Sequence, residues 1–208
     1  MGRYTGPACR LCRREGMKLF LKGARCRMAK CAVETGRVAP GMHGKRPRKM
    51  SDYGLQLREK QRMRHYYGLQ EGQFRLFFER ALRKRGVTGE ALLQALETRL
   101  DNIVFRLGFA ASHRAARQLV LHGHVTLNGR RATVPSMRVP VNGVVEAKGN
   151  AQSQAMIRQA LDAGHVSEVA AWLSLDRDHL KGELLRIPTR DEIAPFVNEQ
   201  LVVELYSR

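Results

Sequence analysis

Apolar residues recur at helical spacing through residues 51–107 of the chain. One stripe, at i, i+3, i+4, i+7 and i+8, is formed by Phe74, Phe77, Phe78, Ala81 and Leu82. A second, at i, i+4, i+7 and i+11, is formed by Leu96, Leu100, Ile103 and Leu107. Each stripe covers one face of an α-helix, so the pattern predicts helices that bury these residues in a core. Ser51 and Gly68 have the residue types that begin and end an earlier, strongly cationic helix.

The pattern then changes to a short helix followed by a hairpin. Ser112 and Gly123 have the residue types that begin and end a helix. Residues 125–127 form a β-prone run, and Asn128-Gly129 is the strongest short hairpin signal because both central residues of a type I′ turn take positive φ. Four arginines accompany this unit: Arg114 and Arg117 in the helix, and Arg130 and Arg131 after the turn.

Further short elements follow the hairpin. Strands are predicted at 144–147, 172–175 and 183–187, with a β-prone piece around Val139 and a helix within 149–164. Thr189 and Glu192 have the spacing of a capping box before a final helical region that ends at residues 201–205. We expect this apolar C-terminal region to fold back onto the early helices.

The charge of the chain indicates a polyanionic partner. The sequence has 37 Lys plus Arg against 19 Asp plus Glu, a formal net charge of +18. Residues 1–50 hold 14 basic and 2 acidic residues (+12), residues 51–148 hold 17 and 8 (+9), and residues 149–208 hold 6 and 9 (−3). The first two-thirds are therefore expected to face nucleic acid, and the last part to complete the core and face protein.

A membrane partner is not expected. The cations do not form the polar side of a long amphipathic helix, and the longest apolar run, near residues 169–175, is too short to span a bilayer. The N-terminus has charges where a signal peptide needs an apolar stretch. We therefore expect a cytoplasmic protein.

All four cysteines lie within the first 31 residues, as Cys9, Cys12, Cys26 and Cys31. Two close pairs separated by a loop allow four thiolates to converge tetrahedrally on Zn²⁺, and nearby cations are expected to lower the thiol pKa values. Metal binding would then supply the folding energy of a segment too small and charged to bury a core. A [4Fe–4S] cluster is the alternative because four cysteinates suit it as well. Two disulfides are disfavoured without a secretion signal.

Residues 39–49 are rich in Gly and Pro and densely cationic. Their four late cations are Lys45, Arg46, Arg48 and Lys49. The composition fits either a linker that lies along phosphate or a disordered basic tether, and the sequence does not separate the two.

Residues 97–147 resemble the RNA-binding module named after small-subunit ribosomal protein four. The resemblance depends on four short motifs: Arg99-Leu100-Asp101-Asn102, Ser112-x-Arg114-x-Ala116-Arg117-Gln118, His122-Gly123-His124-Val125 and Asn128-Gly129. The cysteine segment, residues 51–61 and residues 201–208 extend it over the whole chain, which is similar to the bacterial small-subunit ribosomal protein four family.

This resemblance implies a structural constituent of the small ribosomal subunit, bound to ribosomes in the cytoplasm. The family implies a primary binder of 16S ribosomal RNA that grips a multi-helix junction of the 5′ domain and nucleates 30S assembly. It also implies contact with ribosomal protein five, a role in translational accuracy, and a basic rim at the messenger RNA entry channel, which would consist of Lys45, Arg46, Arg48 and Lys49. Repression of its own messenger RNA is a property of some members that this sequence does not test.

We expect an α+β fold with three parts. Residues 1–44 would be a metal-binding extension with four cysteine ligands. Residues 45–96 and 188–208 would be a helical domain completed by the C-terminal helix. Residues 97–187 would be an inserted RNA-binding domain of helices plus a small antiparallel sheet.

The expected RNA contacts are mainly arginines, because the planar guanidinium donates two hydrogen bonds to a phosphate. Junction RNA is read by shape and backbone, which suits a chain with 6% aromatic residues. The predicted RNA-binding residues are Lys45, Arg46, Arg48, Lys49, Arg58, Arg62, Arg64, Ser112, His113, Arg114, Arg117, Gln118, His122, Asn128, Arg130 and Arg131.

Two other classes of protein fit the sequence less well. An RNA-modifying enzyme, a synthetase or a ribosome-associated factor can carry the same module, but an enzyme needs a catalytic domain with a positioned acid, base or nucleophile. The scattered acids and histidines offer none, so we expect no enzyme activity and no small-molecule substrate. A zinc-dependent DNA-binding regulator would need a recognition helix and usually dimer symmetry, and neither is evident.

Overall fold

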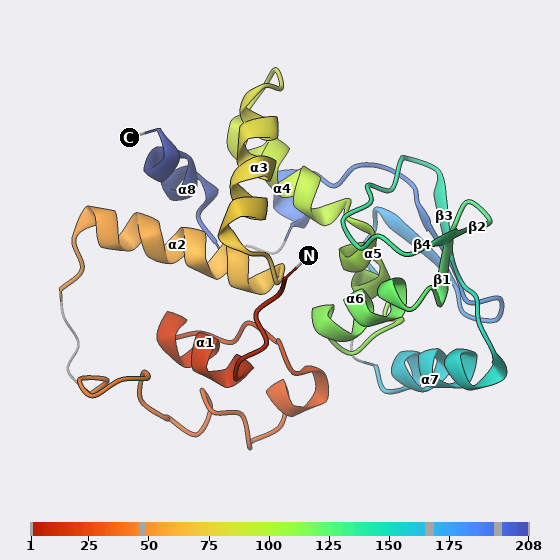
Figure 1. The fold of residues 1–208 in the computed structure, drawn as a ribbon, viewed down its shortest axis with the longest axis horizontal. Coiled ribbons are helices and arrows are strands. Elements are labelled where there is room, and N and C mark those ends of the chain that lie inside the picture. The colour runs from red at the N-terminus through yellow and green to blue at the C-terminus, as the bar shows by residue number, and fades with distance from the viewer. Residues whose placement is uncertain (1, 46–48, 165–168, 194–196, 208) are drawn as a thin grey trace. The chain divides into compact units, whose positions relative to one another are not determined.

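The computed structural model describes residues 2–45, 49–164, 169–193 and 197–207. The chain forms two compact units, coloured along the sequence in Figure 1. The first unit comprises Met1–Leu93 with Ala194–Arg208, and the second comprises Gln94–Ile193. The second unit extends a few residues beyond the predicted 97–187 at each end, and the first includes residues 1–44, which were predicted to be a separate extension.

The first unit is helical in its described residues. Its elements are α1 (Ala8–Glu15), η1 (Gly23–Cys26), α2 (Asp52–Tyr66), α3 (Glu71–Leu82), the start of α4 (Thr88–Glu97) and α8 (Glu199–Tyr206). The predicted cap of α2 is confirmed, because the Ser51 hydroxyl accepts a hydrogen bond from the Gly54 N–H at 3.3 Å. The predicted stripe of α3 is narrower than expected: Phe74, Phe78 and Ala81 are buried, whereas Leu82 is exposed at the helix end.

The C-terminal helix packs beside the early helices, as predicted. Figure 1 shows α8 next to α2. The Gln56 amide donates to Glu204 at 2.9 Å, and the Asn198 N–H donates to Glu59 at 3.1 Å. The ring of Tyr206 stacks on Phe78 with centroids 4.5 Å apart. These contacts join the two ends of the first unit.

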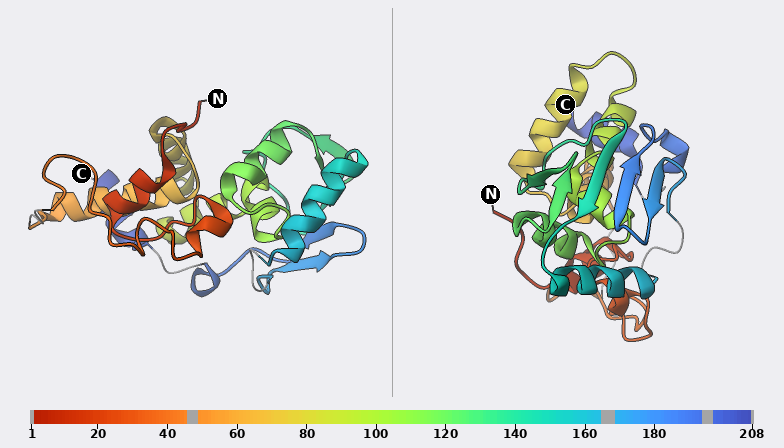
Figure 2. Two further views of the ribbon diagram at one scale, coloured as in Figure 1. Left: turned by 90° about the horizontal axis from the view of Figure 1, so that it is seen from below. Right: turned by 90° about the vertical axis from the view of Figure 1, so that its right-hand side faces the viewer.

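The second unit combines helices with one antiparallel sheet, so the predicted mixture of the two is confirmed. Its elements are the end of α4, α5 (Leu100–Arg106), α6 (His113–Leu121), β1 (Val125–Leu127), β2 (Arg130–Ala132), β3 (Gly143–Ala147), α7 (Ala151–Asp162), β4 (Leu173–Asp176), β5 (Lys181–Leu184) and η2 (Arg190–Glu192). The strand order is β2-β1-β3-β5-β4. The right panel of Figure 2 shows these strands side by side, with α7 across one end of the sheet.

Helices α5, α6 and α7 and the strands share one apolar core. Trp172, expected to be buried, is 1% exposed within it. Gly182 of β5 lies so close to α5 that a Cβ at this position would meet the side chain of Leu107, which explains why the strand has no side chain there. Among the residues that the structure describes, no helix is long and apolar enough to cross a membrane.

The apolar stripe from Leu96 to Leu107 is buried, but it is divided between two helices. Helix α4 ends at Glu97 and α5 begins at Leu100. Between them the backbone bonds to a distant loop: the Leu100 N–H donates to the Met137 carbonyl at 2.8 Å, and the Val139 N–H donates to the Thr98 carbonyl at 2.9 Å. The β-prone piece around Val139 is therefore an isolated bridge to this break and not a strand.

Candidate nucleic-acid interface

The predicted helix and hairpin form as expected in the second unit. The Ser112 hydroxyl accepts from the Ala115 N–H at 3.3 Å and caps α6. Gly123 ends the helix with φ of 71°, and a Cβ there would meet the Arg131 guanidinium. Arg131 donates to the His122 carbonyl at 3.2 Å. A small, left-handed residue at position 123 thus lets a hairpin arginine lie against the end of the helix.

The hairpin turn is fixed by Asn128. Asn128 and Gly129 have φ of 49° and 75°, as a type I′ turn requires. The Asn128 side-chain oxygen accepts from the Val144 N–H, and the Asn128 N–H donates to the Val144 carbonyl, both at 2.8 Å. The predicted RNA contact at Asn128 is therefore a residue whose carbonyl oxygen already holds β1 against β3, while the neighbouring Arg130 is exposed.

The exposed side of this helix and hairpin carries eight of the sixteen predicted contacts. Ser112, Arg114 and Arg117 are partly exposed, and the exposed members are Gln118, His122, Asn128, Arg130 and Arg131. We call this last set, together with Arg114, the α6–hairpin surface.

Arg117 differs from the other cations because a carboxylate inside the fold contacts it. Arg99 makes two hydrogen bonds to Asp101, at 2.9 and 2.7 Å, and its side chain is 1% exposed. Arg117 lies 3.4 Å from the same carboxylate with 11% of its side chain exposed. Asp101 thus joins α5 to α6, and the charge of Arg117 is shared between this contact and any outside partner.

The structure corrects the prediction for His113. This residue is 8% exposed, and its ring stacks on Phe105 with centroids 4.0 Å apart. Its Nε2 lies 3.0 Å from Oδ1 of Asn102. Burial, aided by the nearby positive charges of Arg106 and Arg99, lowers the pKa of His113 to about 3. A neutral ring packed in the core cannot serve as the phosphate contact that the sequence predicted.

Sequence reasoning missed a buried carboxylate that supports the same helices. Glu97 has no exposed side-chain surface and accepts hydrogen bonds from Arg106 at 2.7 Å and from the Asn102 amide at 2.6 Å. The sequence did contain a signal for this ion pair: Glu97 and Arg106 are charged residues nine positions apart among the apolar residues of two helices. The motif Arg99-Leu100-Asp101-Asn102 is therefore a scaffold beneath α6, built from ion pairs and amide hydrogen bonds.

In the first unit, the predicted cations of α2 pair with carboxylates. Arg58 lies 3.5 Å from Glu15, Arg62 pairs with Glu59, and Arg64 lies 3.8 Å from Glu71. All three arginines are partly exposed. Their charge is thus partly balanced within the protein, and their RNA contacts stay a prediction.

Of the four cations predicted in the basic linker, two are described. Lys45 and Lys49 are exposed. Arg46 and Arg48 lie outside the described residues.

The four cysteines are free thiols in the first unit. Cys12, Cys26 and Cys31 are buried, and Cys9 is partly exposed. The Cys26 sulfur accepts from the Lys22 N–H at 3.3 Å, and the Cys12 sulfur accepts from the Leu19 N–H. Such N–H donors are typical around metal-bound thiolates. Among the described residues, however, no group of three or more His, Cys, Asp or Glu side chains has an arrangement that could hold a metal.

The expected lowering of thiol pKa by flanking cations is wrong for two of these residues. Burial raises the pKa of Cys12, opposed by the Leu19 N–H and reinforced by the other three cysteines. Burial also raises the pKa of Cys26, where Lys18 lowers it less than burial raises it. The predicted effect fails because most flanking arginines are exposed to solvent, whereas these sulfurs are buried.

Comparison with known proteins agrees with this architecture. A family model described as "Ribosomal protein S4/S9 N-terminal domain" matches residues 3–97, and one described as "S4 domain" matches residues 98–145. "Small ribosomal subunit protein uS4" of Thermus thermophilus is 55% identical over all of both chains. The same-named proteins of Heliobacterium modesticaldum and Pelobacter propionicus are 52% and 53% identical, again over all of both chains.

The cationic helix and hairpin, together with the two family matches, identify the class of this protein as a ribosomal RNA-binding protein of the S4 type. The relatives carry the name of a ribosomal protein and not of an enzyme. The chain belongs to the small ribosomal subunit protein uS4 family. The RNA-modifying enzyme considered from the sequence is therefore not favoured.

Proposed function

We propose that this protein is a structural constituent of the small ribosomal subunit that binds 16S ribosomal RNA and catalyses no reaction. The observation that carries the proposal is the α6–hairpin surface, in which Arg130 and Arg131 directly follow the hairpin turn. Asn128 of the turn accepts a hydrogen bond from β3, and Arg131 donates one to the end of α6. Full-length similarity to proteins named for the small subunit supports the same function.

We expect the α6–hairpin surface to bind RNA through arginines that the fold already holds in place. Arg130 and Arg131 follow the turn directly, and the register of β1 and β2 sets them opposite Leu127 and Thr126. Guanidinium groups donate paired hydrogen bonds to phosphate oxygens, and folded RNA is recognised mainly through its backbone and shape. The buried Asp101 joins α5 to α6 and the buried Glu97 joins α4 to α5, so little conformational freedom is lost when RNA binds.

The test is binding to naked 16S ribosomal RNA. Purified protein should bind the isolated RNA more tightly than an unrelated ribosomal RNA of similar length, and should sediment with small subunits. Equal binding to both RNAs would contradict the proposal, because nonspecific charge would then account for all of the affinity.

The finer roles implied by the family belong to the same proposal. We infer that the RNA site is a multi-helix junction of the 5′ domain, and that occupying it nucleates 30S assembly. Lys45, Arg46, Arg48 and Lys49 would line the messenger RNA entry channel, and exposure of Lys45 and Lys49 supports this role. We also infer contact with ribosomal protein five, through which the protein would affect translational accuracy. The net −3 charge of residues 149–208 supports a protein partner there, because it disfavours RNA.

We propose further that Cys9, Cys12, Cys26 and Cys31 bind Zn²⁺, with a [4Fe–4S] cluster as the alternative. The donor set supports this proposal: four thiols perturb one another electrostatically, three are buried, and two already accept backbone N–H groups. When bound, the metal would cross-link α1 to Cys26 at the end of η1 and to Cys31 in the following segment. The buried Glu15 of α1 lies 3.5 Å from both Arg58 and His65 of α2, so a metal that holds α1 in place would also stabilise its packing against α2.

Metal analysis tests this second proposal. The purified protein should contain about one zinc per chain, and Cys31→Ser should lose it, because a structural site needs four ligands. His179→Ala is the control, since this exposed histidine lies in the second unit. A broad visible absorption band with iron would establish the cluster instead. Absence of both metals from protein purified without chelator would contradict the proposal.

A further inference from the structure

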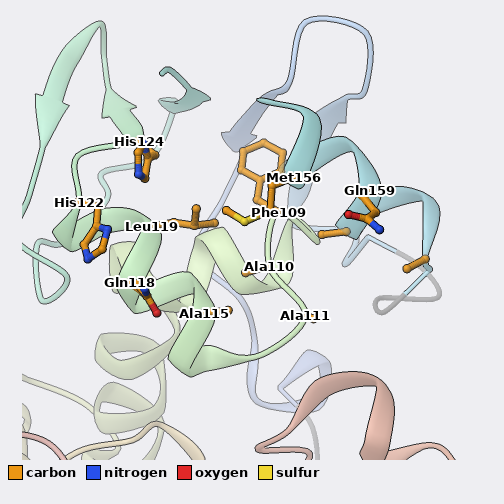
Figure 3. Close-up of a pocket in the computed structure, with 12 residues that line it drawn as sticks. Phe109, Ala110, Ala111, Ala115, Gln118, Leu119, His122, His124, Met156 and Gln159 are labelled. Atoms are coloured by element: carbon orange, nitrogen blue, oxygen red, sulfur yellow. The ribbon is translucent and has the colours of Figure 1, made fainter. Parts of the chain in front are cut away.

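A cavity of about 420 Å³ opens between α6 and α7 in the second unit. Figure 3 shows its lining, with His122 and His124 on one side and Met156 and Gln159 of α7 on the other. Its floor is apolar and buried, formed by Phe109 and Leu119. This volume lies within the range of about 300–1,000 Å³ that holds small organic ligands.

The rim of the cavity combines rings with amides. The His122 and His124 rings are 5.9 Å apart and tilted by 54°. His124 Nδ1 lies 3.1 Å from the Ser153 hydroxyl, which fixes the orientation of its ring. Gln118 and Gln159 lie at the rim with exposed side chains. An apolar floor with stacking rings and amide groups matches the two faces and the polar edge of an unstacked base.

Charge around the opening favours an anionic polymer. None of the twelve described lining residues is acidic. The Arg131 guanidinium is bonded to the His122 carbonyl, and Lys148, whose backbone N–H donates to the His124 carbonyl, has an exposed side chain. The Arg131 guanidinium therefore lies at the rim, and Lys148 adds an exposed cation to the segment bonded to His124, so phosphates that flank an inserted base would meet positive charge near the opening. Gln118 and His122 also belong to the α6–hairpin surface, with which the cavity is continuous.

From these observations we infer that the cavity between α6 and α7 receives a single unstacked nucleobase of the bound RNA. The inference rests on the proposed function and adds to it a base-binding site beside the phosphate-binding surface. The base would lie against Phe109 and Leu119, with the Gln118 amide on the α6 side and the Gln159 amide on the α7 side. Met156, exposed and pointing into the cavity in Figure 3, would cover it.

Filling the cavity tests the inference. Ala160→Leu places a larger side chain in the lining from α7, and Ala163→Leu does so at the exposed end of the helix. Ala155→Leu, exposed on the same helix but outside the lining, is the matched control. We expect each lining variant to bind 16S ribosomal RNA about tenfold more weakly, the effect of losing one stacked base. One base protected from chemical modification by the unaltered protein should become reactive, while the salt dependence of binding stays unchanged.

The outcomes distinguish a failure of the base-binding cavity from a failure of the proposed RNA-binding function. Unchanged affinity and base protection in folded Ala160→Leu and Ala163→Leu would overturn the inference alone. So would normal binding to naked RNA combined with loss of binding to another ribosomal protein, because the cavity would then receive protein. If the unaltered protein failed to bind the RNA, both the proposed function and the inference would be wrong.

Discussion

At the scale of single residues, the buried ionisable groups beneath α6 decide how firmly the RNA-binding surface is held. His113 is neutral in the fold because burial lowers its pKa to about 3, from an ordinary value of 6.5. In the unfolded chain the same ring takes up a proton below pH 6.5. The unfolded state therefore binds more protons between these two values, and stability falls as the pH falls through this window.

We predict that His113 makes the second unit less stable by about 1.4 kcal/mol at pH 5.5 than at pH 7.5. His113→Gln should lose this part of the pH dependence, because glutamine does not titrate. The measurement is urea unfolding of both proteins at the two pH values. His43→Gln, at an exposed histidine of the first unit, is the control. An identical slope in His113→Gln would show that this ring is protonated in the fold.

Asp101 carries the second prediction at this scale. It accepts two hydrogen bonds from buried Arg99 and lies 3.4 Å from Arg117. Asp101→Asn removes the charge that compensates both cations, and we expect a loss of about 3 kcal/mol of stability. Thermal unfolding of the full chain measures it. Asp162→Asn, exposed at the end of α7, should change stability by less than about 0.5 kcal/mol. Equal effects of the two variants would contradict a structural role for Asp101.

At the scale of elements, the sequence predicted the pieces governed by local chemistry. The cap at Ser112, the turn at Asn128 and Gly129, and the capping box of Thr189 and Glu192 all form, because each depends on residues within a few positions. The capping box nevertheless begins a short 3₁₀ turn, and the helix itself, α8, starts later at Glu199. A cap shows where a helical turn begins, but not how long it continues.

Element boundaries that depend on residues far away in the sequence could not be predicted from it. The break between α4 and α5 depends on backbone hydrogen bonds to residues 137–139, which no local pattern records. The candidate RNA surface shows the same limit. Its exposed arginines were predicted from sequence, whereas the burial of His113 depends on Phe105 and Asn102 in the preceding helix. Charge patterns indicate which residues are able to bind RNA, and tertiary packing decides which of them remain outside.

The C-terminal helix gives a prediction at this scale. Tyr206 stacks on Phe74 and Phe78, and its hydroxyl donates to Glu71 at 2.8 Å. Burial alone would raise the pKa of Glu71, but hydrogen bonds from Lys60 and Tyr206 lower it overall, so the carboxylate is the charged acceptor. Tyr206→Ala should lower the protection of α3 and α8 amides against hydrogen exchange about 30-fold, the equivalent of about 2 kcal/mol.

Tyr206→Phe separates the two contributions of this side chain. It keeps the stacking and loses only the hydroxyl, so its effect on exchange should be smaller than that of Tyr206→Ala. Amides of the second unit should exchange as in the unaltered protein in both variants. A uniform loss of protection over the whole chain would show that α8 does not act locally.

At the scale of the whole molecule, the distribution of charge separates RNA-facing parts of the chain from the rest. Residues 1–148 carry net charges of +12 and +9 in two successive parts, and residues 149–208 carry −3. Ion pairs within the protein reduce what is available to RNA: Arg99, Arg106 and Arg117 are held by Asp101 and Glu97. Formal charge therefore overstates the number of phosphates that the protein neutralises.

The salt dependence of binding measures that number directly, because each neutralised phosphate releases condensed counterions. Replacing both Arg130 and Arg131 by alanine should weaken binding to 16S ribosomal RNA and reduce the slope of log K against log salt by about 1.5. Arg177→Ala is the matched control, since this exposed arginine lies between Asp176 and Asp178 in the acidic part. Filter-binding titrations at several salt concentrations compare the three proteins. If the double variant kept the slope of the unaltered protein, the hairpin arginines would face solvent in the complex, and the phosphate contacts would have to come from other cations of residues 1–148.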